Sequence, residues 1–179
     1  DKKCVLIGER INPTGKSKFK AALRENNMDY IISEAIGQEE HGAHMLDVNV
    51  GLPEIDEVDF LTRAIKEIQS VSTLPLQIDT SNAAALEAAM RIYNGKPLVN
   101  SVNGKAESLC AILPLVKKYG GVLVALTLDE NGIPENAEGR FEIAKRIYDE
   151  ALKYGVDSKD LIFDPLAMSV SADKNAARE

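Results

Sequence analysis

Acidic and amide side chains follow several short apolar runs of this sequence, each at the point where a run ends. Asp79 closes the run 75–78, and Ser81 and Asn82 come directly after it. A helix N-cap needs one short polar acceptor, and either Ser81 or Asn82 can supply it for a helix that starts at residue 83. Asp79 is therefore not needed for capping. We interpret it as a candidate for binding or chemistry.

The same layout recurs along the chain. Asp47 and Asn49 end a second run, Asn100 a third and Asp164 a fourth. Asp47 and Asn49 are two residues apart, so they lie on the same side of an extended strand, and one of the two is expected to be structural. Pro165 favours an extended Asp164, whose side chain should then continue the strand alternation instead of curling into a turn. The alternative for each residue is an ordinary turn former or cap.

A charged loop follows the first apolar run, which covers residues 4–8. Glu9 and Arg10 are adjacent in it, so on an extended chain they point in opposite directions. The loop ends with Asn12-Pro13-Thr14-Gly15 and lacks the Gly-Lys-Ser/Thr ending of a phosphate-binding loop.

Hydrophobic periodicity predicts strands that alternate with helices. The expected strands cover residues 4–8, 45–48, 75–79, 97–100, 122–127 and 161–164. The expected helices cover residues 18–24, 28–41, 57–70, 83–93, 106–119 and 137–154, with a further start at Asp173. Pro114 is expected to split the segment 106–119 into a short turn and a second helix, because proline fits a first helical turn best.

Three of these helices carry apolar residues at helical spacing, and we expect those residues in the core. They are Ile31, Ile32, Ala35 and Ile36 in the second helix, Val58, Leu61, Ile65 and Ile68 in the third, and Phe141, Ala144, Ile147, Tyr148 and Ala151 in the last.

The alternation of strands and helices predicts an α/β fold with a parallel sheet. The sheet could be an open doubly wound sheet or a TIM (β/α)8 barrel. Polar residues at nearly every strand end favour the barrel, because all strand ends of a barrel face one mouth. A barrel has eight strands and about 250 residues, whereas this chain supplies six strands in 179 residues. We therefore expect residues 1–179 to form one barrel domain truncated to about six βα units, without strands seven and eight.

Composition excludes several classes of protein. The formal charge of -7 and the absence of a basic cluster argue against a nucleic-acid partner. No apolar run approaches the roughly 20 residues that span a membrane. Cys4 and Cys110 are expected to be buried thiols of a cytoplasmic protein. His41 and His44 lack a carboxylate at ligand spacing, so no metal site is expected.

A barrel mouth lined by carboxylates and amides suits a flat heterocycle with both donors and acceptors. The segments 8–15, 46–49, 78–81, 99–101 and 163–165 also occur in the order found in pterin-binding barrels. The chain resembles the methyltetrahydrofolate-binding domains of corrinoid-dependent methyltransferases, which include the folate module of cobalamin-dependent methionine synthase. The resemblance covers essentially all 179 residues.

This resemblance implies a dihydropteroate synthase-like (β/α)8 barrel that binds the pterin of methyltetrahydrofolate at its C-terminal mouth. It places Asp79, Asn100 and Asp164 on pterin-contacting positions and Glu9 on another folate-facing one, and matches Asn12 and Asp47 to further pocket positions. It implies transfer of the N5 methyl group to Co(I) of a cobalamin or other corrinoid carried by a partner protein or domain.

In that family an asparagine on the seventh strand assists at N5, which would lie beyond Glu179, so no catalytic residue is assigned here. A dihydropteroate synthase-like enzyme is the alternative. Its first loop typically has Asn-x-Thr-Pro-Asp-Ser-Phe where this chain has Asn12-Pro13-Thr14-Gly15. A non-catalytic folate-binding barrel is a third possibility. The open edges of a six-stranded sheet predict a homo-oligomer.

Overall fold

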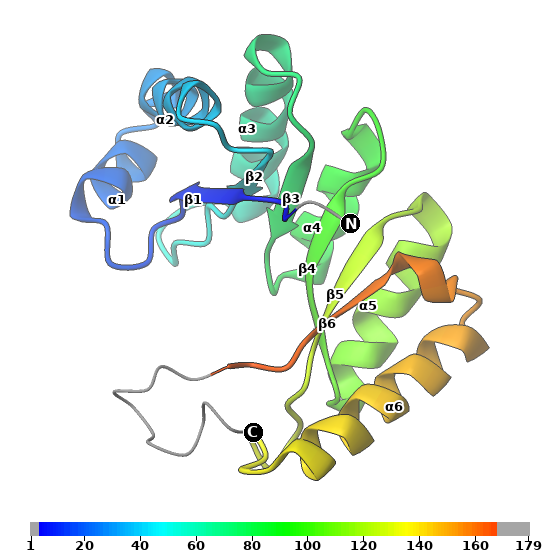
Figure 1. Ribbon diagram of the computed structural model, residues 1–179. Coiled ribbons are helices and arrows are strands. Elements are labelled where there is room, and N and C mark those ends of the chain that lie inside the picture. The colour runs from blue at the N-terminus through cyan, green and yellow to red at the C-terminus, as the bar shows by residue number, and fades with distance from the viewer. Residues whose placement is uncertain (1–3, 168–179) are drawn as a thin grey trace. The chain divides into compact units, whose positions relative to one another are not determined.

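The computed structural model describes residues 4–167, in which six strands alternate with helices (Figure 1). The strands are β1 (Ile7–Ile11), β2 (Met45–Val48), β3 (Leu76–Asp79), β4 (Leu98–Asn103), β5 (Val122–Leu126) and β6 (Leu161–Asp164). The helices are α1 (Ser17–Arg24), α2 (Met28–Glu40), α3 (Glu57–Val71), α4 (Ala83–Ile92), α5 (Ala106–Tyr119), α6 (Ala137–Lys153) and the 3-10 turn η1 (Ser158–Asp160). The helix expected to start at Asp173 lies outside the described residues.

The strands follow the chain order β1-β2-β3-β4-β5-β6. The pairings of β1 with β2, β2 with β3 and β5 with β6 are all parallel, which confirms the predicted α/β class. Six strands are two fewer than a closed (β/α)8 barrel requires. The chain divides into two compact units, Asp1–Leu98 and Val99–Glu179.

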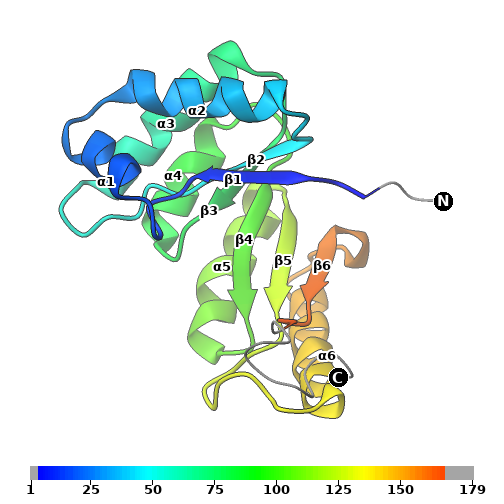
Figure 2. The same ribbon diagram turned by 60° about the vertical axis from the view of Figure 1, so that its left-hand side comes forward.

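In the first unit the helices α1 to α4 pack against one another in chain order. α2 contacts β1, and α3 lies between α2 and α4 in the packing (Figure 2). The fully buried side chains include Ile31 of α2, Leu61, Ile65 and Ile68 of α3, and Leu46 and Ile78 of the strands. The apolar stripe predicted for α3 is thus buried, with Val58 half-buried at its end.

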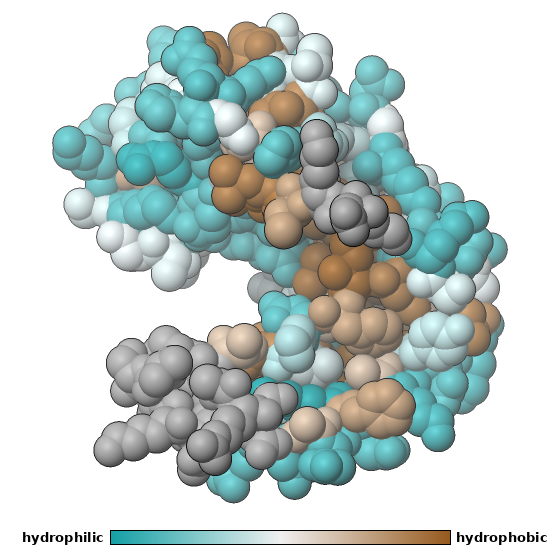
Figure 3. Space-filling view, viewed as in Figure 1, coloured by the Kyte–Doolittle hydropathy of each residue, from teal (hydrophilic) through white to brown (hydrophobic). Residues whose placement is uncertain are grey.

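The second unit packs α5 against α6, and α6 against β5. Leu123 and Ala125 of β5 are buried, whereas the alternate residues Val122 and Val124 are half-buried. β5 therefore has one covered face and one partly open face. Figure 3 shows hydrophobic residues at the surface over β5 and β6, where Ile162 is 49% exposed.

The first strand begins later than predicted. Val5 and Leu6 are exposed, and β1 runs from Ile7 to the buried Ile11. Gly8 lies opposite Leu46 but Ile11 lies opposite Val48, so β1 takes three steps where β2 takes two. The register of the two strands therefore shifts by one residue between Gly8 and Ile11. Pairing with β2, rather than apolar character, thus sets the strand's bounds and brings Glu9 and Arg10 into it.

Two further expectations about elements are wrong. β4 continues to Asn103 instead of ending at Asn100. α5 is one continuous helix with Pro114 inside it, not two segments. Pro114 is exposed, while Leu113 and Val116 beside it are buried. We attribute the continuity of α5 to this burial, which offsets the loss of one backbone bond to Cys110.

Some side chains predicted to be buried lie at the surface. Phe141 is 67% exposed, and Ile36 and Tyr148 are also exposed. α6 buries one narrow stripe, which is formed by Ile143, Ile147 and Ala151. Phe141 and Tyr148 lie outside this stripe and are therefore exposed. Both cysteines, Cys4 and Cys110, are free and exposed, so the expectation of buried thiols is wrong. In the described part of the chain, no helix is long and apolar enough to cross a membrane.

Candidate functional site

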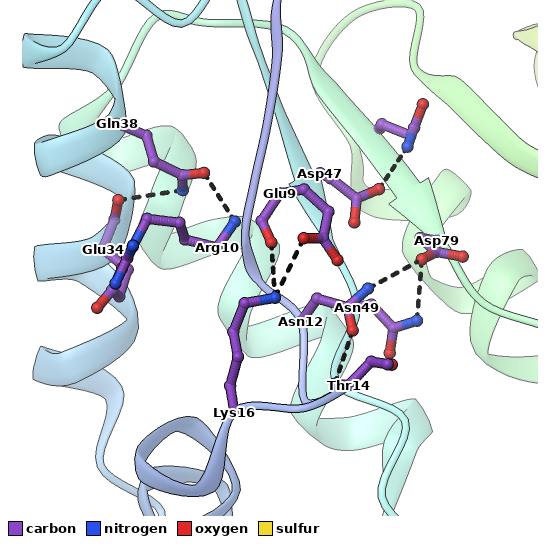
Figure 4. Close-up of polar contacts among 11 residues, drawn as sticks. Glu9, Arg10, Asn12, Thr14, Lys16, Glu34, Gln38, Asp47, Asn49 and Asp79 are labelled. Atoms are coloured by element: carbon purple, nitrogen blue, oxygen red, sulfur yellow. Dashed lines mark hydrogen bonds and ion pairs between the residues drawn. The ribbon is translucent and has the colours of Figure 1, made fainter. Parts of the chain in front are cut away.

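The carboxylate of Asp79, at the end of β3, is the point where two amide side chains meet (Figure 4). Asn49 Nδ2 donates to Asp79 Oδ2 at 3.0 Å, and Asn12 Nδ2 donates to the same oxygen at 3.4 Å. Asn12 follows β1 and Asn49 follows β2, so the ends of three neighbouring parallel strands supply the cluster. Among residues 4–167, no side chain or backbone N–H donates to Asp79 Oδ1.

The capping argument for Asp79 is confirmed. Asn82 is the N-cap of α4, and its Oδ1 accepts from the backbone N–H groups of Ala84 and Ala85 at 3.0 and 3.3 Å. Ser81 is exposed and does not cap. Asp79 therefore does not take part in capping α4.

Asp47 lies beside this cluster and is almost completely buried, with 1% of its surface exposed. Gln77, opposite Asp47 in the β2–β3 register, donates from Nε2 to its Oδ1. Burial raises the pKa of Asp47 to about 7, and the nearby charges of Asp79 and Glu9 act in the same direction against the amides of Gln77 and Asn12. Asp47 therefore changes charge near neutral pH.

The pKa of Asp79 is also raised, mainly because the carboxylate is largely buried. The hydrogen bond from Asn49 opposes this shift, and the negative charges of Glu9 and Glu57 add to it. Several carboxylates of the first unit thus lie close enough to interact. A ligand that donates hydrogen bonds would relieve their mutual repulsion.

Glu9 and Arg10 point in opposite directions, as predicted (Figure 4). Lys16 Nζ contacts Glu9 Oε2 at 3.1 Å and the Glu9 carbonyl at 3.0 Å, at an exposed position. Arg10 instead turns to α2, where its Nε donates to Glu34 Oε2 at 2.7 Å. Glu9 is therefore on the cluster's side of β1, with an exposed carboxylate.

A hollow of about 590 Å³ adjoins the cluster, between the loops that follow β2 and β3. Asn49, Glu57 and Thr80 are among its lining residues. The hydroxyl of the buried Thr80 donates to Glu57 Oε1, and Asn82 N donates to that hydroxyl at 3.0 Å. These bonds fix the wall of the hollow beside Asp79.

The other two predicted residues, Asn100 and Asp164, belong to the second unit, and both are half-buried. Asp164 Oδ1 accepts from Leu166 N at 2.8 Å, so the side chain does curl into a turn, contrary to the prediction. Pro165 keeps Asp164 extended, but Leu166 adopts φ 56° and this returns its N–H to the carboxylate. Thr127 N and Oγ1 each donate to the Asp164 carbonyl at 3.1 Å.

Three contributors to the site had no strong signal in the sequence. Asn49 was distinguishable only by its two-residue spacing from Asp47. Gln77 was a polar residue inside an apolar run, which is unusual for a buried strand. Glu57 was indistinguishable from the acidic residues that commonly occupy the first turn of a helix.

His41 and His44 each bond to a backbone group. His41 Nδ1 lies 2.5 Å from the Gly37 carbonyl, and His44 Nδ1 accepts from Leu6 N at 2.9 Å. Within residues 4–167, no group of three His, Cys, Asp or Glu side chains has the geometry of a metal site.

The sequence model of a protein family, described as "Pterin binding enzyme", matches residues 8–178 of this chain. The chain belongs to this pterin-binding family. The methionine synthase of Mycobacterium tuberculosis (strain ATCC 25618 / H37Rv) is 29% identical over 184 residues, which cover 99% of this chain and 15% of that protein. The methionine synthase of Mycobacterium leprae (strain TN) is 29% identical over 181 residues, covering 98% of this chain and 15% of that protein. The chain thus spans a small part of each relative.

Solved structures of dihydropteroate synthases have the same fold. The Xanthomonas albilineans enzyme in complex with indole-2-carboxylic acid and 6-chloroguanine aligns with a TM-score of 0.71 and 19% identity, over 99% of this chain and 67% of that one. The Yersinia pestis enzyme with a pterine-sulfa conjugate gives 0.70 and 16%, over 96% and 63%. The enzyme from Vibrio fischeri ES114 gives 0.66 and 17%, over 93% and 62%. These likenesses confirm the dihydropteroate synthase-like barrel class, of which residues 4–167 supply six strands.

Proposed function

We propose that this chain binds methyltetrahydrofolate through its pterin and presents the N5 methyl group to a corrinoid carried by a partner protein or domain. Membership of the pterin-binding family, together with methionine synthases among its relatives, supports the choice of ligand. The observation that carries the proposal is the half-buried Asp79 carboxylate, held at a strand end with Oδ1 accepting no bond from residues 4–167.

The chemistry of a pterin edge fits these residues. The amino-pyrimidinone edge has N–H groups that donate, and a carboxylate such as Asp79 or Asp164 accepts charge-assisted bonds from them. Asn100 supplies one donor and one acceptor in the same side chain. Glu9, Asn12 and Asp47 are proposed as further folate-binding residues. Asn12 already uses both ends of its amide within the protein, so its contribution is to hold other groups in place.

The corrinoid, when bound to its own protein, supplies a Co(I) nucleophile for the methyl group. The chain's residues have to bind and orient the folate and to keep the amine a good leaving group, because N5 retains the electron pair of the broken bond and takes up a proton. No residue of this chain is assigned to hold the corrinoid.

The test is methyl transfer from methyltetrahydrofolate to added Co(I) cobalamin, followed by absorbance, alongside calorimetric titration of the folate. Asp79→Ala and Asp164→Ala should each lower the folate affinity roughly ten- to hundredfold, because each removes a charge-assisted bond. Unchanged affinity in both variants would contradict the assignment. Binding without transfer would indicate a non-catalytic folate-binding barrel. Formation of dihydropteroate from a pterin and an aromatic amine would indicate the synthase instead.

A further inference from the structure

Asn12 and Asn49 are used in the same way, although they come from different loops. Each accepts a backbone N–H two residues further on through Oδ1, from Thr14 N and Gly51 N respectively, both at 2.9 Å. Each donates through Nδ2 to Asp79 Oδ2. One carboxylate oxygen is thereby tied through two amides to the loops that follow β1 and β2 (Figure 4).

The two oxygens of Asp79 therefore have different surroundings. Oδ2 accepts two amide hydrogens, whereas Oδ1 accepts none from residues 4–167. An ionised carboxylate is acceptor-only and has about four lone-pair sites, so two bonds on one oxygen hold the group in a single orientation. Asn12 is 6% exposed, so little water competes for its bond.

We infer that Asn12 and Asn49 are positioning residues. They hold Asp79 in place through its Oδ2, and the same bonds hold the loops after β1 and β2 to Asp79. Oδ1 is then the oxygen of Asp79 that accepts from the ligand. The inference rests on the proposed function for the identity of that ligand. It adds that Asp79 offers the ligand one acceptor oxygen rather than a bidentate fork. It also adds that Asp79 orders the loops at Thr14 and Gly51.

The first arm of the test needs no ligand. Carboxyl 13C NMR of the full chain follows the titration of Asp79 in the wild type and in Asn49→Ala. Loss of the Asn49 donor should raise the pKa of Asp79, because that bond favours the charged form. Asn49→Asp should raise it further, since it keeps an acceptor for Gly51 N but replaces the donor by a like charge.

Asn27→Ala is the matched control for that arm. Asn27 also accepts a backbone N–H, from Tyr30 at 3.1 Å, but it caps α2 and does not contact Asp79. It should lose the local bond and leave the titration of Asp79 unchanged. An Asp79 titration that is the same in the wild type, Asn49→Ala and Asn49→Asp would overturn the inference.

The second arm measures the hydrogen exchange rates of the Thr14 and Gly51 amides. These rates report whether the bonds to Asp79 Oδ2 order the two loops, separately from what Oδ1 does. An asparagine at position 79 can keep its carbonyl oxygen on Asn12 and Asn49 and turn its NH2 group to the ligand. Asp79→Asn should therefore retain slow exchange at both amides, while Asp79→Ala accelerates both. Equal exchange in Asp79→Ala and the wild type would show that Asp79 does not order the loops.

The third arm measures methyltetrahydrofolate affinity in a double-mutant cycle. Asn49→Ala should weaken binding about two- to tenfold in the wild-type background and not at all in the Asp79→Ala background, because Asn49 acts through Asp79. Equal losses in both backgrounds would mean that Asn49 contacts the ligand itself. If the wild type does not bind the folate, the proposed function fails, and the two ligand-free arms still decide the inference about Asp79.

Discussion

At the scale of single residues, Asp47 makes the stability of the fold depend on pH. Its pKa is about 7 in the folded protein against an ordinary 3.8, so between these values the folded state binds more protons than the unfolded state. The free energy of unfolding should therefore fall as the pH rises from about 4 to 7. The full shift corresponds to a loss of at most about 4 kcal/mol in the free energy of unfolding, and this loss is complete once the pH is above about 7.

Asp47→Asn should remove most of this loss. The amide is neutral at every pH and keeps an oxygen for Gln77 Nε2. Urea unfolding at pH 5, 6, 7 and 8 should show that the variant is more stable than the wild type at pH 8, and that this difference is smaller at pH 5. Asp29→Asn, at an exposed position of α2, controls for removal of a charge. A variant that loses as much stability with pH as the wild type would disprove the role of Asp47.

At the scale of elements, α4 depends on one cap. Asn82→Ala removes the acceptor for Ala84 N and Ala85 N and should cost about 1 kcal/mol of stability. Ser81→Ala is the matched control and should cost close to nothing, because Ser81 is exposed and does not cap. Thermal unfolding of both variants, with folate titration, checks this. A loss of folate affinity in Asn82→Ala without a loss of stability would move Asn82 from the cap to the site.

α5 should become more stable without its internal proline. Pro114→Ala restores an N–H that can bond the Cys110 carbonyl, while the more flexible alanine raises the entropy of the unfolded chain. The balance should be a gain of about 1–2 kcal/mol in the free energy of unfolding. Denaturant unfolding measures it. A lower midpoint for Pro114→Ala would mean that the proline suits its position better than a regular helix would.

At the scale of the whole molecule, β1 and β6 are the first and last strands of the order, and each is paired with one neighbour. Such edges carry backbone groups that can pair with another chain. Apolar side chains are exposed near both, including Leu6 before β1 and Ile162 in β6. We therefore expect the 179-residue chain to self-associate.

Sedimentation over a range of concentrations tests this expectation, with Ile162→Lys as the variant that places a charge on the edge. The lysine should shift the chain towards the monomer, because edge charges oppose strand pairing. Phe141→Lys, on the exposed surface of α6, controls for added charge away from the edge. A wild type that stays monomeric at every concentration would contradict the prediction.

The sequence alone was enough for the order of the elements and for the inference that Asp79 is not needed to cap α4. Apolar periodicity is a local property, and it located β2, β3, β6 and most of the helices, because each of them buries one regular face. The argument about Asp79 was local as well, since a neighbouring residue could cap α4.

Contacts between distant residues decided the rest. The bounds of β1 follow from its register with β2, and the exposure of Phe141 follows from which stripe of α6 meets β5. Asn49 and Asp79 are 30 residues apart, and only the parallel pairing of β2 with β3 brings them within 3.0 Å. The shifted pKa of Asp47 has the same origin, because burial is a property of the folded chain and not of the residue type.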